Sequence, residues 1–270
     1  MHWKRWITAL VLIPPLLLLI LFGSPLLFTL VIIAVSILSL WEYFRIVYHG
    51  HTPPVGPAFT GWAYTTAVLA IAAVHNRHFE ALMGALALHL IGTALLTVHR
   101  FTICRDAPIV AVKQLGGMIY LPILFSFLIM IRMGENGPLW VLFLFGVVAC
   151  GDTGALYAGT YLGRHKLCPS VSPNKTVEGA VGGLLANLLF AWIFKLLFFT
   201  EMDGTTCTIV ALAAGGAGQV GDLFESVFKR ASGIKDSSQL IPGHGGFLDR
   251  LDALLVAAPV GYWLKEFLLP

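Results

Sequence analysis

Residues 138–161 read PLWVLFLFGVVACGDTGALYAGTY and carry a single charged side chain, that of Asp152. As an α-helix this run would rise about 1.5 Å per residue and would exceed the roughly 30 Å of hydrocarbon in a bilayer. The whole chain is similar, because 57% of its 270 residues are hydrophobic and only 11% are charged. Soluble domains average about 25% charged residues. We therefore predict an all-α, polytopic integral membrane protein.

Further apolar runs bring the prediction to about nine transmembrane helices. The first run follows Lys4 and Arg5 as a signal peptide would, but it contains Pro14 and Pro15, and no small-residue cleavage pattern follows it. We expect it to be retained as a helix. Besides the run 138–161, the predicted helices are this first one, near residues 6–22, and those near 24–40, 58–74, 80–98, 115–131, 177–199, 205–228 and 251–268.

The distribution of basic residues predicts the orientation of the helices. If Lys4 and Arg5 are cytosolic, strict alternation places most other basic residues on the cytosolic side, as the positive-inside rule requires. The exceptions are Arg77, Arg132, Lys195 and Lys265. We therefore predict a cytosolic N-terminus, and the length of the chain favours a bacterial cell inner membrane.

Charge, cysteines and histidines point away from other classes of protein. The net charge of +3 is explained by basic residues at the membrane edge, so we expect no nucleic-acid partner. The four cysteines form no C-x-x-C pair, and we expect neither a structural zinc site nor a disulfide. Four histidines, at positions 49, 51, 75 and 78, fall in predicted loops on opposite membrane faces, which argues against a shared metal ion.

No soluble domain or long linker interrupts the helices, so we predict one membrane domain over residues 1–270. Residues 1–114 carry few polar intramembrane groups and are interpreted as mainly scaffold. Residues 115–270 are interpreted as catalytic helices and cytosolic loops.

Asp152 is the first candidate functional residue, because a carboxylate within an apolar helix is costly and usually serves function. Alternatively, it pairs with a basic side chain of a neighbouring helix and locks the bundle. Two small-residue patterns flank the next segment, Gly159-x-x-x-Gly163 and Gly179-x-x-x-Gly183, and both indicate close helix packing.

The segment between these patterns, KLCPSVSPNKTVEG at residues 166–179, predicts the start of a helix. Ser172 followed by Pro173 is typical of an N-cap with proline in the first turn. Lys175 and Thr176 would add a cation and a hydroxyl where helix N–H groups favour an anion. The segment is therefore a candidate phosphate site, although capping alone also explains the serine and proline.

Residues 221–230, GDLFESVFKR, place Asp222, Glu225, Ser226 and Lys229 at i, i+3, i+4 and i+7 on one helix face. A ladder of salt bridges is the alternative interpretation, but solvated faces are not expected below the membrane interface. We interpret this face as functional.

A polar segment, ASGIKDSSQLIPGHGGFLDRLD, follows at residues 231–252. With Lys229 and Arg230 it gathers cations and carboxylates beside the bilayer. Lys and Arg bind phosphate oxygens, and Asp oxygens suit hard cations such as Mg²⁺. His244 lies among glycines that let backbone approach a ligand closely. Asp249 and Asp252 share a face at the start of the last helix.

Other motifs are absent or excluded by context. Gly216-x-Gly218-x-x-Gly221 has the letters of a dinucleotide fingerprint, but no strand precedes it. Neither a P-loop nor a G-x-S-x-G nucleophile elbow occurs.

Together, the polar motifs resemble the signature of the phosphatidate cytidylyltransferases, also called CDP-diacylglycerol synthases. The N-terminal half resembles that family only in its hydrophobic helices. The matching motifs are Ser226-x-x-Lys229-Arg230, Lys235-Asp236, Pro242-x-His244-Gly-Gly-x-x-Asp249-Arg250-x-Asp252, and upstream Gly221-Asp222-Leu-x-Glu225-Ser226, Ser172-Pro-x-Lys175-Thr-x-Glu178-Gly and Gly151-Asp-x-Gly-Ala.

The resemblance implies a Mg²⁺-dependent transfer of CMP from CTP to phosphatidate, giving CDP-diacylglycerol and pyrophosphate for phospholipid biosynthesis at the cytosolic face. Its implied partners are CTP, phosphatidate and membrane lipids. A homodimer and a second, monovalent cation are further candidates.

The resemblance also implies roles for individual residues. Asp222 and Asp249 would bind the metal, and His244 would act at the leaving group. The other members of the implied catalytic set are Lys229, Arg230, Lys235, Asp236, Arg250 and Asp252. The implied substrate-binding residues are Asp152, Ser172, Lys175, Thr176 and Ser226.

Two alternatives remain open. One is a related CTP-dependent enzyme that acts on another lipid phosphate or a polyprenol. The other is a lipid or ion transporter in which Asp152, Asp222 and Glu225 would relay protons or bind cargo. A transporter would be expected to show an internal repeat and access to both membrane faces, and neither is evident.

Overall fold

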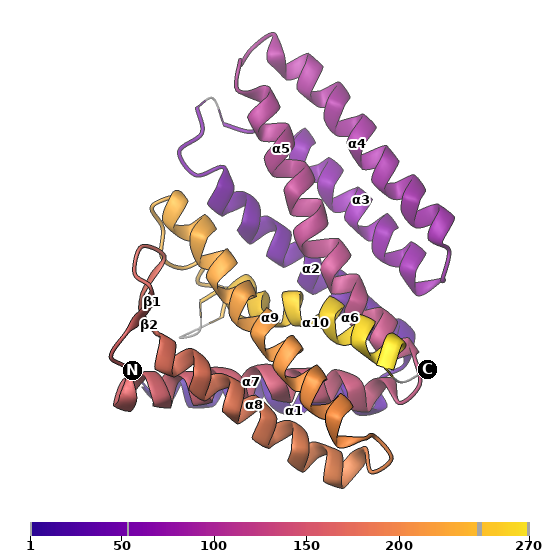
Figure 1. Ribbon diagram of the computed structural model, residues 1–270. Coiled ribbons are helices and arrows are strands. Elements are labelled where there is room, and N and C mark those ends of the chain that lie inside the picture. Colours follow the sequence, from indigo (N-terminus) through magenta and orange to yellow (C-terminus); the bar gives the residue numbers. More distant parts are fainter. Residues whose placement is uncertain (1, 53, 242–244, 269–270) are drawn as a thin grey trace. The chain divides into compact units, whose positions relative to one another are not determined.

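Apolar helices make up most of the computed structural model, which describes residues 2–52, 54–241 and 245–268 (Figure 1). The first half contains α1 (His2–Phe22), α2 (Pro25–Val47), α3 (Pro57–His75), α4 (Phe79–Phe101), α5 (Ala107–Met118), the π-helical turn η1 (Ile119–Ile123) and α6 (Leu124–Met133). The second half contains α7 (Gly137–Leu162), β1 (Lys166–Cys168), β2 (Ser172–Thr176), α8 (Val177–Phe198), α9 (Gly204–Ala231) and α10 (Leu248–Leu268).

Seven helical segments of the described chain are long and apolar enough to cross a membrane. They are α2, α3, α4, the continuous segment Ala107–Met133, α7, α8 and α9. The predicted spans at both ends of the chain do not meet these criteria: only Val11–Phe22 of α1 qualifies as a shorter apolar helix, and α10 carries charged residues near both its ends. Large apolar side chains such as Leu95, Leu189 and Leu196 are exposed, as is typical of a lipid-facing surface. The fold is that of a multi-pass helical protein.

The predicted span 115–131 is part of the longer segment Ala107–Met133, which is interrupted by η1. Pro122 lies inside this π-helical turn. Because proline has no N–H to donate, the regular α-helical hydrogen-bond pattern cannot pass through it, and the backbone widens locally.

A small antiparallel hairpin was not predicted, and it corrects the expected helix start. β1 pairs with β2, with Lys166 opposite Thr176 and Cys168 opposite Ser172. Ser172 is therefore in a strand and does not cap a helix. The next helix, α8, begins at Val177, and its N-cap is Thr176, whose hydroxyl accepts a hydrogen bond from the Gly179 N–H at 3.0 Å.

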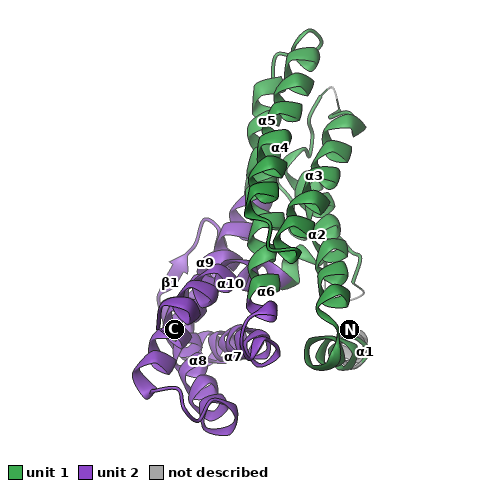
Figure 2. Ribbon diagram, turned by 90° about the vertical axis from the view of Figure 1, so that its right-hand side faces the viewer, with its two compact units in different colours: residues 1–130, 231–250 green, residues 131–230, 251–270 purple. Residues whose placement is uncertain are grey.

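The chain forms two compact units, which Figure 2 shows in different colours. Unit 1 comprises residues 1–130 and 231–250, and unit 2 comprises residues 131–230 and 251–270. The polar segment 231–250 belongs to the same unit as the N-terminal helices.

Unit 1 is held together by aromatic packing and by hydrogen bonds between α2, α3 and α5. The Tyr43 hydroxyl donates to the Lys113 carbonyl at 3.0 Å, and the Gln114 amide donates to the Phe59 carbonyl at 2.6 Å. The rings of Phe44 and Tyr48 stack with centroids 5.3 Å apart. Each of these polar groups is satisfied within the unit, as burial requires.

Unit 2 depends on close contact between α7 and α8 at glycines. A Cβ added at Gly154 or at Gly182 would collide with the side chain of an alanine on the opposite helix. Gly179 approaches Gly159 closely enough that a Cβ would lie 3.2 Å from its Cα. The small-residue patterns therefore function as predicted, by allowing two backbones to approach.

The false dinucleotide fingerprint on α9 is also a packing feature. A Cβ on Gly221 would collide with the backbone carbonyl of Asp252, and one on Gly218 would lie 3.5 Å from the carbonyl of Ala253. A Cβ at Gly218 would make only ordinary contact, so it is glycine at position 221 that lets α9 cross α10 closely within unit 2.

Candidate active site

A cavity of about 560 Å³ lies in unit 2, between α7, the hairpin, α8 and α9. Four of the predicted site residues line it: Asp152, Lys175, Thr176 and Asp222. They come from α7, β2 and α9, so segments up to 70 positions apart in the chain meet at one cavity. The cavity combines charged groups with apolar wall residues such as Ala155 and Leu156, which is typical of a ligand pocket.

Lys175 and Asp222 form an ion pair at the cavity wall, with Nζ 2.5 Å from Oδ2. Their side chains are 27% and 35% exposed, so solvent and a ligand can reach both charges. Because the pair is only partly buried, exchanging partners with an incoming anion costs less than it would in a dry core. Lys175 lies on β2, whose last residue, Thr176, is the N-cap of α8.

Glu178 stabilises the turn on which Lys175 and Thr176 lie. Its carboxylate accepts hydrogen bonds from the backbone N–H groups of Arg164 and His165, and its Oε1 lies 2.6 Å from Nδ1 of His165. These contacts join the end of α7 to the start of α8 and so fix the hairpin between them.

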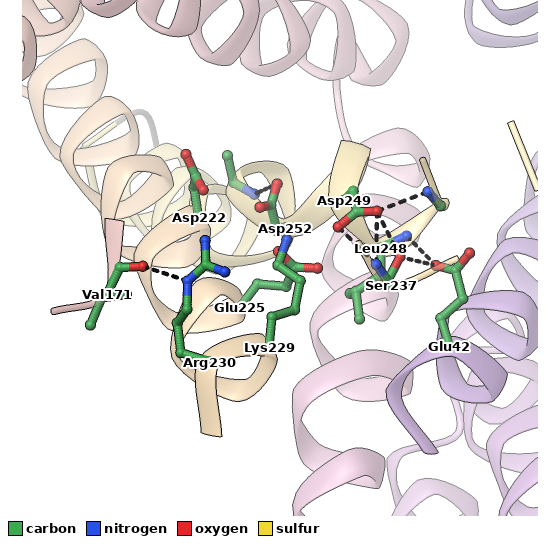
Figure 3. A network of polar contacts seen from close by, with 12 residues as sticks. Glu42, Val171, Asp222, Glu225, Lys229, Arg230, Ser237, Leu248, Asp249 and Asp252 are labelled. Atoms are coloured by element: carbon green, nitrogen blue, oxygen red, sulfur yellow. Dashed lines mark hydrogen bonds and ion pairs between the residues drawn. The ribbon is translucent and has the colours of Figure 1, made fainter. Parts of the chain in front are cut away.

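The predicted functional face of α9 contains a buried ion pair between Glu225 and Lys229. The Glu225 side chain is fully buried and that of Lys229 is 12% exposed, so the contact is not a solvated surface bridge. Figure 3 shows Lys229 extending from α9 toward Glu225 and Asp252. Ser226 is half-buried on the same helix. None of these residues lines the cavity.

Arg230, near the end of α9, reaches the loop of the hairpin. Its Nε donates to the Val171 carbonyl at 3.0 Å (Figure 3). The residue is otherwise exposed. The contact links α9 to the same hairpin that carries Ser172 and Lys175, although Ser172 itself does not line the cavity.

Asp252 is a buried carboxylate on α10, with 7% of its surface exposed. Its Oδ1 accepts a hydrogen bond from the Ala253 N–H at 2.8 Å. The charges of Asp222, Lys229 and Asp152 all act on it. Three carboxylates and a lysine of unit 2 are therefore electrostatically connected around the cavity and the adjoining helices.

In unit 1, the Asp249 carboxylate binds two other residues of the polar segment, Ser237 and Gly246. Its carboxylate accepts hydrogen bonds from the Ser237 N–H at 3.1 Å, the Ser237 hydroxyl at 2.9 Å and the Gly246 N–H at 2.8 Å (Figure 3). The aspartate predicted to bind metal therefore also organises the loop that precedes α10.

The remaining predicted residues of the polar segment are solvent-exposed: Lys235, Asp236 and Arg250. All three belong to unit 1. His244 lies outside the described residues. The structure thus gathers Asp152, Lys175, Thr176 and Asp222 at one cavity, and it gives Asp249 a separate set of contacts within unit 1.

Sequence reasoning missed several polar residues near these sites. Asn174 and Gln219 line the cavity, and the Gln219 amide donates to the Ala180 carbonyl at 2.9 Å. Gln219 lies three positions before Asp222, on the same helical face, so helical spacing could have identified it. Glu42 is fully buried on α2 and binds the polar segment of unit 1, and no local pattern marks it.

The histidines behave differently from one another. His75 Nδ1 lies 2.9 Å from the Thr29 hydroxyl, an ordinary structural contact. His51 lies with Cys104 and Asp106, and their potential ligand atoms are all within 4.8 Å of one another. Among the described residues no other group of three His, Cys, Asp or Glu side chains meets that distance. His51 therefore lies near a cysteine and an aspartate, a grouping that the sequence did not suggest.

The cavity can bind a polyanion together with a hard cation. Lys175 offers three N–H donors to phosphate oxygens, and Thr176 adds a hydroxyl. Asp152 and Asp222 offer oxygen ligands, and a site for Mg²⁺ typically uses one or two carboxylates while substrate phosphates and water complete the coordination. The donor set of the cavity fits such an ion.

Comparison with known proteins agrees with this chemistry. A phosphatidate cytidylyltransferase of Haemophilus influenzae is 33% identical over 98% of this chain and 99% of its own length. A protein of that name from Bacillus subtilis is 40% identical over 54% of this chain and 55% of its own, and one from Staphylococcus epidermidis is 41% identical over 47% and 48%. The family model described as "Cytidylyltransferase family" matches residues 3–268. This chain belongs to the cytidylyltransferase family.

Proposed function

We propose that this protein is a phosphatidate cytidylyltransferase, which transfers CMP from CTP to phosphatidate and releases pyrophosphate. The observation that carries the proposal is the Lys175–Asp222 ion pair at the wall of a charged cavity, in a chain of the cytidylyltransferase family. The products are CDP-diacylglycerol and pyrophosphate, so the reaction belongs to phospholipid biosynthesis.

The substrate itself supplies the nucleophile. A phosphate monoester has a second pKa of about 6, so phosphatidate is largely dianionic at neutral pH. One of its oxygens attacks the α-phosphorus of CTP and forms a new P–O bond. The bond between the α-phosphorus and the bridging oxygen breaks, and pyrophosphate leaves with the electron pair. No strong general base is required.

The remaining difficulty is the repulsion between two polyanions. Positioned cations lower this barrier by stabilising the charge that develops on the transferred phosphoryl group. We assign Lys175 to phosphate binding, where it exchanges its contact with Asp222 for substrate oxygens. Thr176 donates at the same end of α8, and Lys229 and Arg230 act as the further cations of α9.

Asp222 is the proposed metal ligand of the cavity, with Asp152 and Asp252 as nearby carboxylates. Bound Mg²⁺ would neutralise phosphate charge and polarise the reacting P–O bonds. Asp249 as a second ligand stays a prediction from the sequence. So do a monovalent cation, a homodimer, and catalytic roles for Lys235, Asp236, His244 and Arg250.

The membrane topology is part of the proposal. We propose nine spans, with α1 and α10 crossing the bilayer in addition to the seven apolar segments, and a cytosolic N-terminus. That arrangement would place the cavity on the cytosolic side, where CTP is available. The bacterial origin of the relatives supports assignment to the cell inner membrane.

The test is transfer of a cytidine label into lipid by the purified protein in detergent. Label should enter the organic phase only when phosphatidate and Mg²⁺ are both present, and EDTA should abolish the transfer. Transfer to another lipid phosphate but not to phosphatidate would identify a related enzyme with a different acceptor. Absence of transfer to any lipid phosphate, in protein shown to be folded, would overturn the proposal and favour a transport function.

A further inference from the structure

Glu42 connects the N-terminal helices to the polar segment of unit 1. It lies on α2 with 0% of its surface exposed, within a helix that is otherwise strongly apolar. A carboxylate this deeply buried is costly unless its oxygens are hydrogen-bonded. The hydrogen-bond partners of this carboxylate therefore indicate its role.

Both oxygens of Glu42 accept hydrogen bonds from the polar segment of unit 1. Figure 3 shows the contacts with Ser237 and Leu248. Oε1 accepts from the Ser238 hydroxyl at 2.5 Å and from the Phe247 N–H at 3.0 Å. Oε2 accepts from the Ser237 hydroxyl at 3.2 Å and from the Leu248 N–H at 2.6 Å. Four donors thus converge on one side chain, and all come from residues 237–248.

Two of these donors are the N–H group of Leu248, the first residue of α10, and that of Phe247 just before it. The first N–H groups of a helix have no partner within it and are normally satisfied by a residue just before the helix. Here the carboxylate of a different helix takes that role at Phe247 and Leu248. A negative charge at this end is also favoured by the helix dipole.

The other end of the segment is held by the same carboxylate. The Ser237 hydroxyl is shared between Glu42 and Asp249, and the Arg45 guanidinium donates to the Ser237 carbonyl at 3.4 Å. Between the two ends, the Ile241 N–H donates to the Gly245 carbonyl at 2.8 Å. Glu42 therefore connects Ser237 and Ser238, and also Phe247 and Leu248, to α2.

Gly246 shows that the contact leaves no spare room. A Cβ at this position would collide with the Ser237 hydroxyl and with Oε1 of Glu42. A side chain there would have to displace the carboxylate or the loop.

We propose that Glu42 is a positioning residue for the cytidylyl transfer. It fixes the position of the start of α10. Asp249 and Arg250 lie there, in unit 1, and both belong to the family signature. This inference rests on the proposed function. It assigns a role in the reaction to a helix that sequence reasoning interpreted as scaffold.

The primary variant is Glu42→Gln, which preserves size but replaces one acceptor oxygen with an NH₂ group that faces donors. The matched control is Ser39→Ala. Ser39 is also fully buried on α2, and its hydroxyl has no hydrogen-bond partner among the described residues. Both proteins are compared with wild type by hydrogen exchange of the peptide containing residues 237–248 and by steady-state label transfer.

Glu42→Gln should speed exchange in residues 237–248 and lower kcat about ten- to a hundredfold, because small misplacements of reacting groups carry costs of that order. KM for CTP should change less than about threefold, since loss of positioning acts mainly on the chemical step. Ser39→Ala should match wild type in both measurements. Glu42→Gln with wild-type exchange, or with the kcat of Ser39→Ala, would overturn the proposal.

If Glu42→Gln does not fold, Ser238→Ala provides the same test from the loop. It removes one donor and leaves the carboxylate in place, and it should give a smaller change of the same kind. Gly246→Ala should reproduce the kcat loss. Wild-type values in a folded Ser238→Ala protein would contradict the proposal.

Lack of label transfer by wild-type protein would instead contradict the proposed function. The exchange measurement would still report on the role of Glu42.

Discussion

Lys175 and Asp222 form an ion pair, Nζ to Oδ2 at 2.5 Å, between the strand that precedes α8 and the middle of α9. The two residues are 47 positions apart in sequence, and the hairpin brings them together at the wall of the cavity. Both retain enough exposure to bind a ligand. In the proposed mechanism this pair would separate when substrate enters, so that Lys175 would bind phosphate and Asp222 would bind the metal.

Substitution of Asp222 by Asn should lower kcat/KM about a hundredfold or more. The change removes a charge that the proposed site uses for metal binding, and loss of one electrostatic group at a reacting centre has effects of that order. The measurement is label transfer at saturating Mg²⁺ by protein that elutes as wild type in size-exclusion chromatography.

Asp203→Asn is the matched control for this variant. Asp203 lies just before the same helix and accepts hydrogen bonds from the backbone and hydroxyl of Thr206. Asn caps helices about as well as Asp, so this protein should keep wild-type activity. Comparable losses in the two variants would mean that the Asp222 effect is not specific to the site.

Lys175→Gln should lower kcat/KM roughly 10- to 100-fold. A hydrogen bond to a charged group contributes about 1.5–3 kcal/mol, and each 1.4 kcal/mol corresponds to roughly a factor of ten. Lys166→Gln, on the exposed partner strand, is the control and should change activity less than about twofold. The double variant of Lys175 and Asp222 should lose less than the product of the single losses, because the residues are in direct contact. Fully multiplicative losses would show that the two residues act independently.

Gly221→Ala should destabilise the protein, because the new Cβ would collide with the Asp252 carbonyl where α9 crosses α10. Overpacking of this kind typically costs about 1–3 kcal/mol. Gly216→Ala lies on the same helix with nothing within 4 Å of its Cβ and should not lower the melting temperature. The melting temperatures of both proteins in detergent test the packing, and equal values for the two variants would contradict it.

Thr176→Val should lower stability by about 1 kcal/mol, because it removes the hydroxyl that caps α8. Thr176→Ser keeps that hydroxyl and should retain wild-type stability. The comparison is made by thermal unfolding in detergent, with label transfer measured in parallel. A Thr176→Ser protein as unstable as Thr176→Val would show that the methyl group, and not the cap, is responsible.

Hydropathy was sufficient to predict most helices, and glycine spacing was sufficient to predict the contact between α7 and α8. Each of these patterns can be recognised within a single short stretch of sequence. Gly216, Gly218 and Gly221 illustrate the same point. Their letters match a dinucleotide fingerprint, but the absence of a preceding strand excludes that interpretation. In the structure Gly221 allows the close approach of α10.

The helix start at Ser172 was wrong for an identifiable reason. Ser172 followed by Pro173 has the local features of an N-cap, but Thr176 has comparable capping ability. The choice between them is made by the pairing of Cys168 with Ser172 and of Lys166 with Thr176, which holds residues 172–176 extended. A capping pattern contains no information about that pairing.

Glu42 could not have been identified from the sequence for a similar reason. Its partners Ser237 and Leu248 lie 195 and 206 positions away. Helical periodicity places Glu42 on an apolar helix and leaves its function unspecified. By contrast, Asp222 stood out because charged residues are rare on an apolar helix. Lys175 stood out because it adds a cation where a predicted helix start favours an anion.

The most direct test of the central claim is to follow two forms of CTP, one labelled at the α-phosphorus and one at the γ-phosphorus, with phosphatidate and Mg²⁺. Attack at the α-phosphorus predicts that the α label enters lipid and that the γ label appears only in pyrophosphate, in equal molar amounts. Entry of the γ label into lipid would show phosphoryl transfer instead and would contradict the assignment of this protein as a cytidylyltransferase acting on phosphatidate.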